Sequence, residues 1–272
     1  MSASTFHTPR SRDRVIALHC SGASAAQWRS LEARLGQTFA FAAPEHYDSG
    51  HAPPWRGGDT FTCADEAART LALVDASERK VHLIGHSYGG GIALHIALAR
   101  PDRIASLTLY EPSAFYLLKH FGDGAAPLAE IKALAATVAT GMRVGEPRTA
   151  AKAFVDYWGG KGAWDAIRPA LQDAIVRWLP KAVLEFGALF NEPTHWSALR
   201  TFRSPVLIVR GEYAPAPTRL IADMLLPIFP DARHAVVAEA GHMGPVTHPD
   251  AVNALIVSHI EETIAGLHRR AA

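Results

Sequence analysis

Ser87 stands in a setting that could make it a nucleophile. Residues 85–89 read Gly-His-Ser-Tyr-Gly, with an apolar run before them and a helical apolar pattern after them. A serine on so sharp a turn sits at strained backbone angles, and Gly85 and Gly89 leave room that a Cβ would fill. The helix start then directs its amides and positive dipole end toward developing negative charge. The pattern predicts a nucleophile elbow, although a glycine-rich turn that only packs a helix onto a sheet has the same residues.

A serine hydroxyl is a poor nucleophile until a base removes its proton, and an imidazole can take that proton and later return it. His242 follows the last expected strand, at 234–238, and its position favours it as this base. One histidine proves little in a chain with 14 of them, so a plain turn histidine is the alternative. Four others are interpreted as packing or surface residues: His86, His95, His248 and His259.

The first apolar run, residues 15–18, leads into a loop of small residues at 19–24. Such residues let the backbone approach a ligand closely. A free amide near Ser21 could therefore pair with the amide of Tyr88 as an oxyanion hole. The alternative is a plain strand-to-helix turn capped by Ser24.

Apolar runs and helical patterns alternate along most of the chain. We expect strands near 15–18, 39–43, 81–84, 104–110, 205–211 and 234–238, with helices near 27–35, 63–76 (N-cap Thr62), 92–98, 218–229 and 250–267. This order predicts an α/β fold with a doubly wound, mostly parallel sheet that binds ligands beyond the strands' carboxyl ends. Five residues follow strands at that edge: Ser21, Ser87, Glu111, Ala214 and His242.

Residues 113–203 show helical patterns only and are rich in aromatic residues. We expect an inserted helical cap there, on a core domain formed by residues 1–112 and 204–272. Most of these rings should pack the cap onto the sheet, and several should roof the site.

Composition narrows the function. The chain has 272 residues, 49% of them hydrophobic, and 27 basic against 26 acidic residues. Near-zero net charge argues against a nucleic-acid or anionic-membrane partner and favours a small molecule. Cys20 and Cys63 form no metal-type cluster, so we expect no metal and no cofactor. Residues 1–14 lack the apolar core of a signal peptide and no later run reaches membrane length, so we expect a cytoplasmic protein.

From residue 14 to residue 267 the chain resembles the α/β-hydrolase superfamily. That family runs in the order oxyanion loop, nucleophile elbow, helical cap, acid and histidine, and residues 19–22, 85–89, 113–203 and 241–243 follow the same order. The resemblance implies that His242 is the catalytic histidine. Many relatives have His-Gly where this chain has His19-Cys20, which places an extra Cβ and thiol beside the oxyanion loop.

The acid departs from the family pattern. Relatives usually carry Gly-x-x-Asp after the penultimate strand, whereas residues 211–214 read Gly-Glu-Tyr-Ala, and Ala214 cannot orient an imidazole. Glu111, at the end of the strand after the elbow helix, is the replacement we favour. The resemblance supports it, because some members of the superfamily, certain haloalkane dehalogenases among them, have a Glu acid at the matching strand end. Glu212 is the second candidate. Two alternatives stay open: Glu111 is only a solvated carboxylate before a proline, or Ala214 is an engineered replacement of the acid.

Those dehalogenases use an aspartate nucleophile, whereas Ser87 indicates acyl transfer. We expect a serine hydrolase with Ser87 as nucleophile, His242 as base, Glu111 as acid, and the amides of Ser21 and Tyr88 as oxyanion donors. Its partner would be a small hydrophobic or amphipathic ester, lactone or thioester. A C–C bond hydrolase acting on a diketone-like compound is one alternative, and a non-catalytic protein that binds a small molecule under the cap is another.

Overall fold

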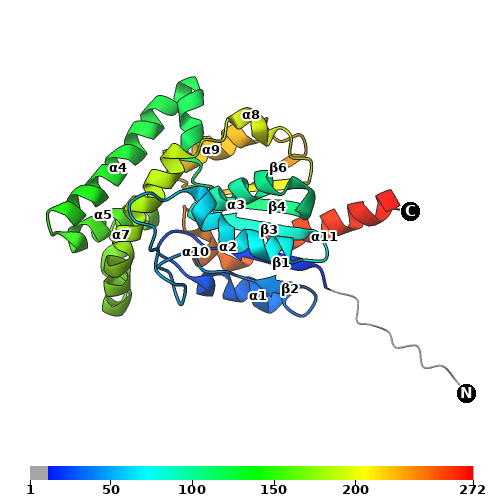
Figure 1. Ribbon diagram of the computed structural model, residues 1–272, viewed down its shortest axis with the longest axis horizontal. Coiled ribbons are helices and arrows are strands. Elements are labelled where there is room, and N and C mark those ends of the chain that lie inside the picture. Colours follow the sequence, from blue (N-terminus) through cyan, green and yellow to red (C-terminus); the bar gives the residue numbers. More distant parts are fainter. Residues whose placement is uncertain (1–11, 272) are drawn as a thin grey trace, which may run out of the picture.

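The computed structural model describes residues 12–271. These residues form a six-stranded parallel sheet of order β2-β1-β3-β4-β5-β6 (Figure 1). The strands are β1 (Arg14–Leu18), β2 (Ala40–Ala42), β3 (Val81–His86), β4 (Ile104–Tyr110), β5 (Val206–Gly211) and β6 (Ala232–Val237). The predicted doubly wound α/β fold is confirmed. The expectation about a signal peptide concerns mainly residues 1–11, which lie outside the described residues.

The two central strands, β3 and β4, are buried along their whole length. This explains their continuous apolar runs, because a parallel strand covered on both faces has no solvent side. The pairing sets His86 of β3 opposite Tyr110 of β4, and Tyr110 opposite Val209 of β5. The carboxyl ends of the three strands therefore meet at one edge.

Helices cover both faces of the sheet. One face packs against α2 (Cys63–Asp75), α3 (Tyr88–Ala99) and α9 (Ala216–Leu225), and the other against α1 (Arg29–Leu35) and α11 (Pro249–Ala271). The predicted N-cap of α2 is confirmed: Thr62 and Asp65 form a reciprocal capping box. Helix α9 begins earlier and ends earlier than the predicted 218–229. Pro217 fits a first turn, and Pro227 lacks the N–H that a further turn would need.

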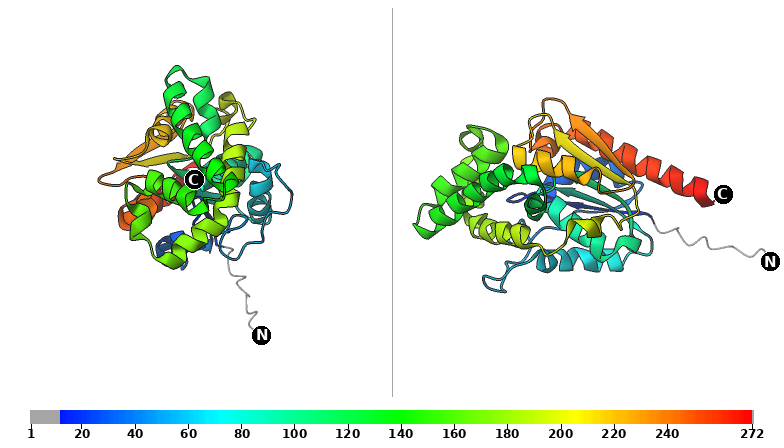
Figure 2. Two further views of the ribbon diagram at one scale, coloured as in Figure 1. Left: turned by 90° about the vertical axis from the view of Figure 1, so that its left-hand side faces the viewer. Right: turned by 90° about the horizontal axis from the view of Figure 1, so that it is seen from above.

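Between β4 and β5 the described chain is helical. Short 3₁₀ turns at Phe115–His120 and Gly122–Gly124 lead into α4 (Ala125–Arg143), α5 (Pro147–Gly159), α6 (Ala163–Ala166), α7 (Pro169–Asn191) and α8 (Trp196–Leu199). Helices α4, α5 and α7 gather at one end of the sheet, and α11 extends from the opposite end (Figures 1 and 2). The domain boundaries at 112/113 and 203/204 stay predictions.

A short helix that the sequence analysis did not anticipate, α10 (Gly244–Thr247), follows His242 directly. Across residues 12–271, the helices are all too short or too polar to span a bilayer.

Candidate active site

Ser87 lies at the turn between β3 and α3 with φ 54° and ψ −116°, a backbone conformation that non-glycine residues rarely adopt. Backbone atoms approach Gly85 and Gly89 so closely that neither position has room for a Cβ. A Cβ on Gly85 would lie 2.4 Å from the carbonyl oxygen of Gly89, and one on Gly89 would lie 2.5 Å from that of His19. The predicted steric role of both glycines is confirmed.

The strained turn is held by its neighbour β4. The Ser87 amide donates to the Tyr110 carbonyl at 3.0 Å, and the Ser113 amide donates to the Ser87 carbonyl at 2.9 Å. Strain of this kind persists only where surrounding contacts over-determine the conformation. These two bonds hold the Ser87 backbone in this conformation, and the hydroxyl itself contacts His242 Nε2 and Ser113 Oγ.

His242 joins Ser87 to Glu111. Its Nε2 lies 2.8 Å from Ser87 Oγ, and its Nδ1 lies 2.7 Å from Glu111 Oε2. A carboxylate only accepts, so in the neutral ring Nδ1–H donates to Glu111 and Nε2 accepts the Ser87 hydroxyl. This is the tautomer that a histidine needs to act as a base toward serine.

Glu111 is fully buried, and its carboxylate is satisfied on both oxygens. Oε1 accepts the Gly211 amide at 2.9 Å, and Oε2 accepts the Thr218 hydroxyl at 2.9 Å in addition to His242. Glu111 also has a positive φ of 42°, directly after β4. This backbone and three donors aim the carboxylate at the imidazole.

The two positions that competed with Glu111 are placed differently. Ala214 is buried and offers only a methyl group. Glu212 is exposed, and its Oε2 accepts the Glu239 amide at 2.9 Å. Of the three residues, the structure brings only Glu111 into hydrogen-bond contact with His242.

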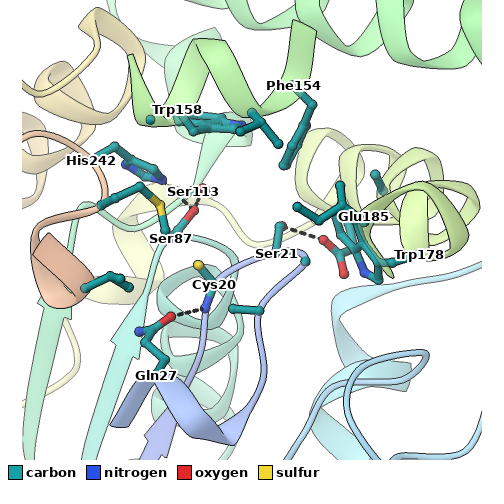
Figure 3. A pocket seen from close by; sticks show the side chains of 18 of the residues that line it. Cys20, Ser21, Gln27, Ser87, Ser113, Phe154, Trp158, Trp178, Glu185 and His242 are labelled. Carbon is teal, nitrogen blue, oxygen red and sulfur yellow. Dashed lines mark hydrogen bonds between the residues drawn. The ribbon is translucent and has the colours of Figure 1, made fainter. Parts of the chain in front are cut away.

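Ser21 lies on the other side of Ser87 from His242 (Figure 3), and Tyr88 directly follows Ser87 at the start of α3. Within residues 12–271, neither backbone amide is engaged by a protein acceptor. The Cys20 amide is already used, because it donates to Gln27 Oε1 at 3.1 Å. The predicted N-cap at Ser24 is also present, because its side chain accepts the Ala26 amide at the start of a 3₁₀ turn. A capped turn and a loop that supplies an oxyanion amide are therefore compatible interpretations of residues 19–24.

A cavity of about 500 Å³ opens above Ser87. The Trp158 ring covers His242, with the ring centroids 4.2 Å apart, and Phe154 lies beside it on α5 (Figure 3). The walls are mainly apolar side chains: Phe115, Phe154, Val155, Ile167, Ile175, Trp178, Phe186 and Leu189. Among residues 12–271, the lining includes neither lysine nor arginine, and its one carboxylate is Glu185.

Sequence reasoning missed several polar residues here. Ser113 Oγ lies 3.1 Å from Ser87 Oγ, and Glu185 Oε2 accepts the Ser21 hydroxyl at 2.5 Å. Glu185 also pairs with Lys181, one helical turn earlier on α7. That i, i+4 charge pair within an apolar helix was the available signal. In the described part of the chain, no group of three His, Cys, Asp or Glu side chains could hold a metal ion.

The profile of the alpha/beta hydrolase family matches residues 15–255. The chain belongs to this family. It is 28% identical to lipase LipV of Mycobacterium tuberculosis, over 93% of this chain and 95% of the relative. The enol-lactonase of Burkholderia xenovorans superimposes with a TM-score of 0.72 at 16% identity, covering 92% of each chain. The 2-hydroxy-6-oxo-6-phenylhexa-2,4-dienoate hydrolase of a Rhodococcus species superimposes with a TM-score of 0.67 at 17% identity, covering 92% of this chain and 91% of that one. These two likenesses are of fold.

Proposed function

We propose that this hydrolase cleaves a small, uncharged carboxylic ester, lactone or thioester through an acyl-enzyme. The observation that carries the proposal is the continuous hydrogen-bonded chain from Ser87 through His242 to Glu111 at the floor of an apolar cavity. The relative named as a lipase supports ester hydrolysis, and the enol-lactonase supports the same fold's use for a lactone.

In this proposal Ser87 Oγ attacks the substrate carbonyl while its proton passes to His242 Nε2. Glu111 stabilises the imidazolium that forms. The carbonyl oxygen becomes negative, and the amides of Ser21 and Tyr88 donate to it. His242 then protonates the leaving oxygen or sulfur, and the acyl group stays on Ser87. A water molecule then gives a proton to His242 and attacks this ester. The bond between Ser87 Oγ and the acyl carbon breaks, His242 returns the proton to Oγ, and the carboxylic acid product leaves.

The cavity supports an uncharged substrate. Its apolar walls suit an alkyl or aromatic acyl chain, and among the described residues that line it there is no lysine or arginine to pair with a substrate carboxylate. Burying an unpaired carboxylate there would be unfavourable. This argues against the C–C hydrolase alternative where the substrate is an acid, as the dienoate in the name of the Rhodococcus enzyme is. The complete chain of hydrogen bonds argues against a binding protein without activity.

A fluorophosphonate probe tests the nucleophile, because it labels only an activated serine. Wild type should be labelled, and Ser87→Ala should be neither labelled nor active toward p-nitrophenyl butyrate. An unlabelled wild type would support the binding-protein alternative instead.

The charge preference needs a matched pair of substrates: p-nitrophenyl pentanoate, and p-nitrophenyl hemisuccinate with a carboxylate in the same region. We expect kcat/KM to favour the uncharged ester by at least about tenfold, which corresponds to roughly 1.4 kcal/mol. Equal turnover, or preference for the hemisuccinate, would show that the cavity does accept an anion.

A further inference from the structure

The two residues with candidate oxyanion amides are also held through their side chains. Ser21 donates its hydroxyl to Glu185 Oε2 at 2.5 Å, and Tyr88 donates its phenol to Glu66 Oε2 at 2.8 Å. These carboxylates come from α7 and α2, two helices far apart in the sequence. Neither bond takes part in the hydrogen-bonded chain from Ser87 to Glu111.

One lysine joins the two carboxylates. Lys181 Nζ lies 2.6 Å from Glu66 Oε2 and 3.3 Å from Glu185 Oε1, and its side chain is 1% exposed. The same ammonium lies 4.2 Å from the centroid of the Phe61 ring and 5.2 Å from that of Tyr88. We call Ser21, Glu66, Tyr88, Lys181 and Glu185 the Lys181 cluster.

Burying the charges of the Lys181 cluster is unfavourable in itself. Burial disfavours the charged form of Lys181 and acts to lower its pKa. The carboxylates of Glu185 and Glu66 outweigh this effect, so the pKa of Lys181 is raised. Burial raises the pKa of Glu185, and Lys181 only partly offsets that effect. Buried ion pairs are often no more stabilising than apolar residues of the same shape. Fold stability is therefore a weak explanation for three charged side chains beside the cavity.

A second set of contacts reaches the same loop from Glu66. Its Oε1 accepts the Tyr47 amide at 3.0 Å and lies 3.6 Å from His46 Nδ1. His46 Nε2 donates to the His19 carbonyl at 3.0 Å, and the His46 amide donates to His19 Nε2 at 3.2 Å. The backbone before Ser21 is thus fixed by His46, and the Ser21 side chain is fixed by Glu185.

We propose that Lys181 is a positioning residue: by bridging Glu66 and Glu185 it holds Ser21 and Tyr88 so that their amides converge on one oxygen. This rests on the proposed acyl-transfer function. Oxyanion donors contribute only when they are preorganised at hydrogen-bond distance from the developing charge, and small displacements greatly reduce the rate. Since Lys181 and Glu185 both lie on α7, the proposed oxyanion hole is complete only when this helix packs against α2 and α3.

The test removes each side-chain bond and keeps each amide. Tyr88→Phe loses only the bond to Glu66, and Tyr88 does not line the cavity. Ser21→Ala loses only the bond to Glu185. For each variant, kcat and KM for p-nitrophenyl butyrate are measured together with the Ki of a trifluoromethyl ketone, whose adduct with Ser87 carries an oxyanion. We expect kcat to fall about five- to tenfold and Ki to rise by the same factor, with KM within about twofold of wild type.

Ser106→Ala is the matched control. It also removes one buried hydrogen bond, between Ser106 Oγ and His82 Nδ1 at 2.8 Å, but in the sheet interior away from the strands' carboxyl ends. Its kcat and Ki should equal those of wild type. Unchanged Ki in both Tyr88→Phe and Ser21→Ala, or an equal change in Ser106→Ala, would overturn the proposal. An unlabelled wild type in the fluorophosphonate assay would overturn the proposed function and this inference together, whereas a labelled wild type with unchanged Ki overturns only the inference.

Discussion

The two sides of Ser87 are built by different means. On the side that we propose for acid-base chemistry, His242 and Glu111 form a linear chain of two hydrogen bonds, and each residue follows a strand or strand-end turn. On the side that we propose for the oxyanion, the side chains of Ser21 and Tyr88 bond to charged residues of α7 and α2 that Lys181 joins. The sheet edge, with Thr218 of α9, sets the first arrangement, whereas the second requires the helices between β4 and β5 to be in place.

The two sides also differ in how they compensate a buried carboxylate. Glu111 is satisfied by an amide, a hydroxyl and an imidazole, so no permanent cation is needed. Glu66 and Glu185 share the ammonium of Lys181. Loss of one donor to Glu111 leaves others, but loss of Lys181 leaves two buried carboxylates without their shared counter-charge. The acid-base side should therefore be sensitive in activity, and the oxyanion side in both activity and stability.

The largest expected effect is on the acid-base side. Glu111→Gln keeps the shape of the side chain but removes the charge that stabilises the imidazolium and selects its tautomer. We expect kcat to fall about 10³- to 10⁴-fold, in line with the loss of a triad carboxylate in other serine hydrolases. The measurement is kcat for p-nitrophenyl butyrate, with circular dichroism to verify folding.

Glu212→Gln is the matched control for that substitution, because Glu212 stands in the family's usual acid region but contacts the Glu239 amide at the surface. Its kcat should stay within about twofold of wild type. The assignment of Glu111 fails if Glu212→Gln abolishes activity while Glu111→Gln keeps it.

The next effect is on stability at the oxyanion side. Lys181→Met keeps the approximate length of the side chain and removes the ammonium, so two buried carboxylates lose their counter-charge. We expect the free energy of unfolding in urea to fall by about 3–5 kcal/mol. Lys152→Met removes an exposed lysine paired with Asp156 and Asp165, and should change the free energy of unfolding far less, because solvent screens exposed ion pairs.

A double variant, Lys181→Met with Glu185→Gln, removes one charge of each sign. It should recover part of the lost stability but none of the oxyanion-dependent activity, because the bridge between Glu66 and Glu185 is still absent. Recovery of kcat to the wild-type value in this double variant would contradict a positioning role for Lys181.

The same contrast explains what could be predicted from sequence. Ser87, His242 and Glu111 each follow an apolar strand pattern, so the sheet edge brings them together once strand order is assumed. Ser21 and Tyr88 could also be named from the sequence, but their contacts with Glu185, Glu66 and Lys181 could not be found in this way. Ser21 and Glu185 are 164 positions apart, and their contact depends on how α7 packs over the β1 loop. Ser113 was missed for a similar reason, since Pro112 only marks the end of a strand and says nothing about where the next hydroxyl points.

The smallest expected effect, taken over a single pH unit, concerns acid stability. Burial, reinforced by His46, lowers the pKa of His19 to about 3, and burial, with His259, lowers that of His82 to about 4. Both values lie below the ordinary one near 6.5, so between those limits the unfolded chain binds protons that the folded chain does not. These two histidines therefore lower the free energy of unfolding as pH falls from about 6.5 to about 4. Each histidine contributes up to about 1.4 kcal/mol per pH unit.

Two substitutions, His19→Gln and His82→Gln, distinguish the effect of these histidines on acid stability from their effect on the loop that holds Ser21. In each variant, the free energy of unfolding should depend less steeply on pH between about 6 and 5. The difference in slope should correspond to about one fewer proton taken up on unfolding, whatever the variant's absolute stability. His82 lies in the sheet interior and bonds Ser106, so His82→Gln should keep kcat. The His19 ring lies with Nδ1 2.8 Å from the Cys20 carbonyl oxygen and accepts the His46 amide on Nε2, so His19→Gln loosens the loop before Ser21 and should lower kcat about tenfold. Equal kcat in the two variants would mean that the contacts before Ser21 do not position its amide, and that the loop is fixed from Glu185 alone.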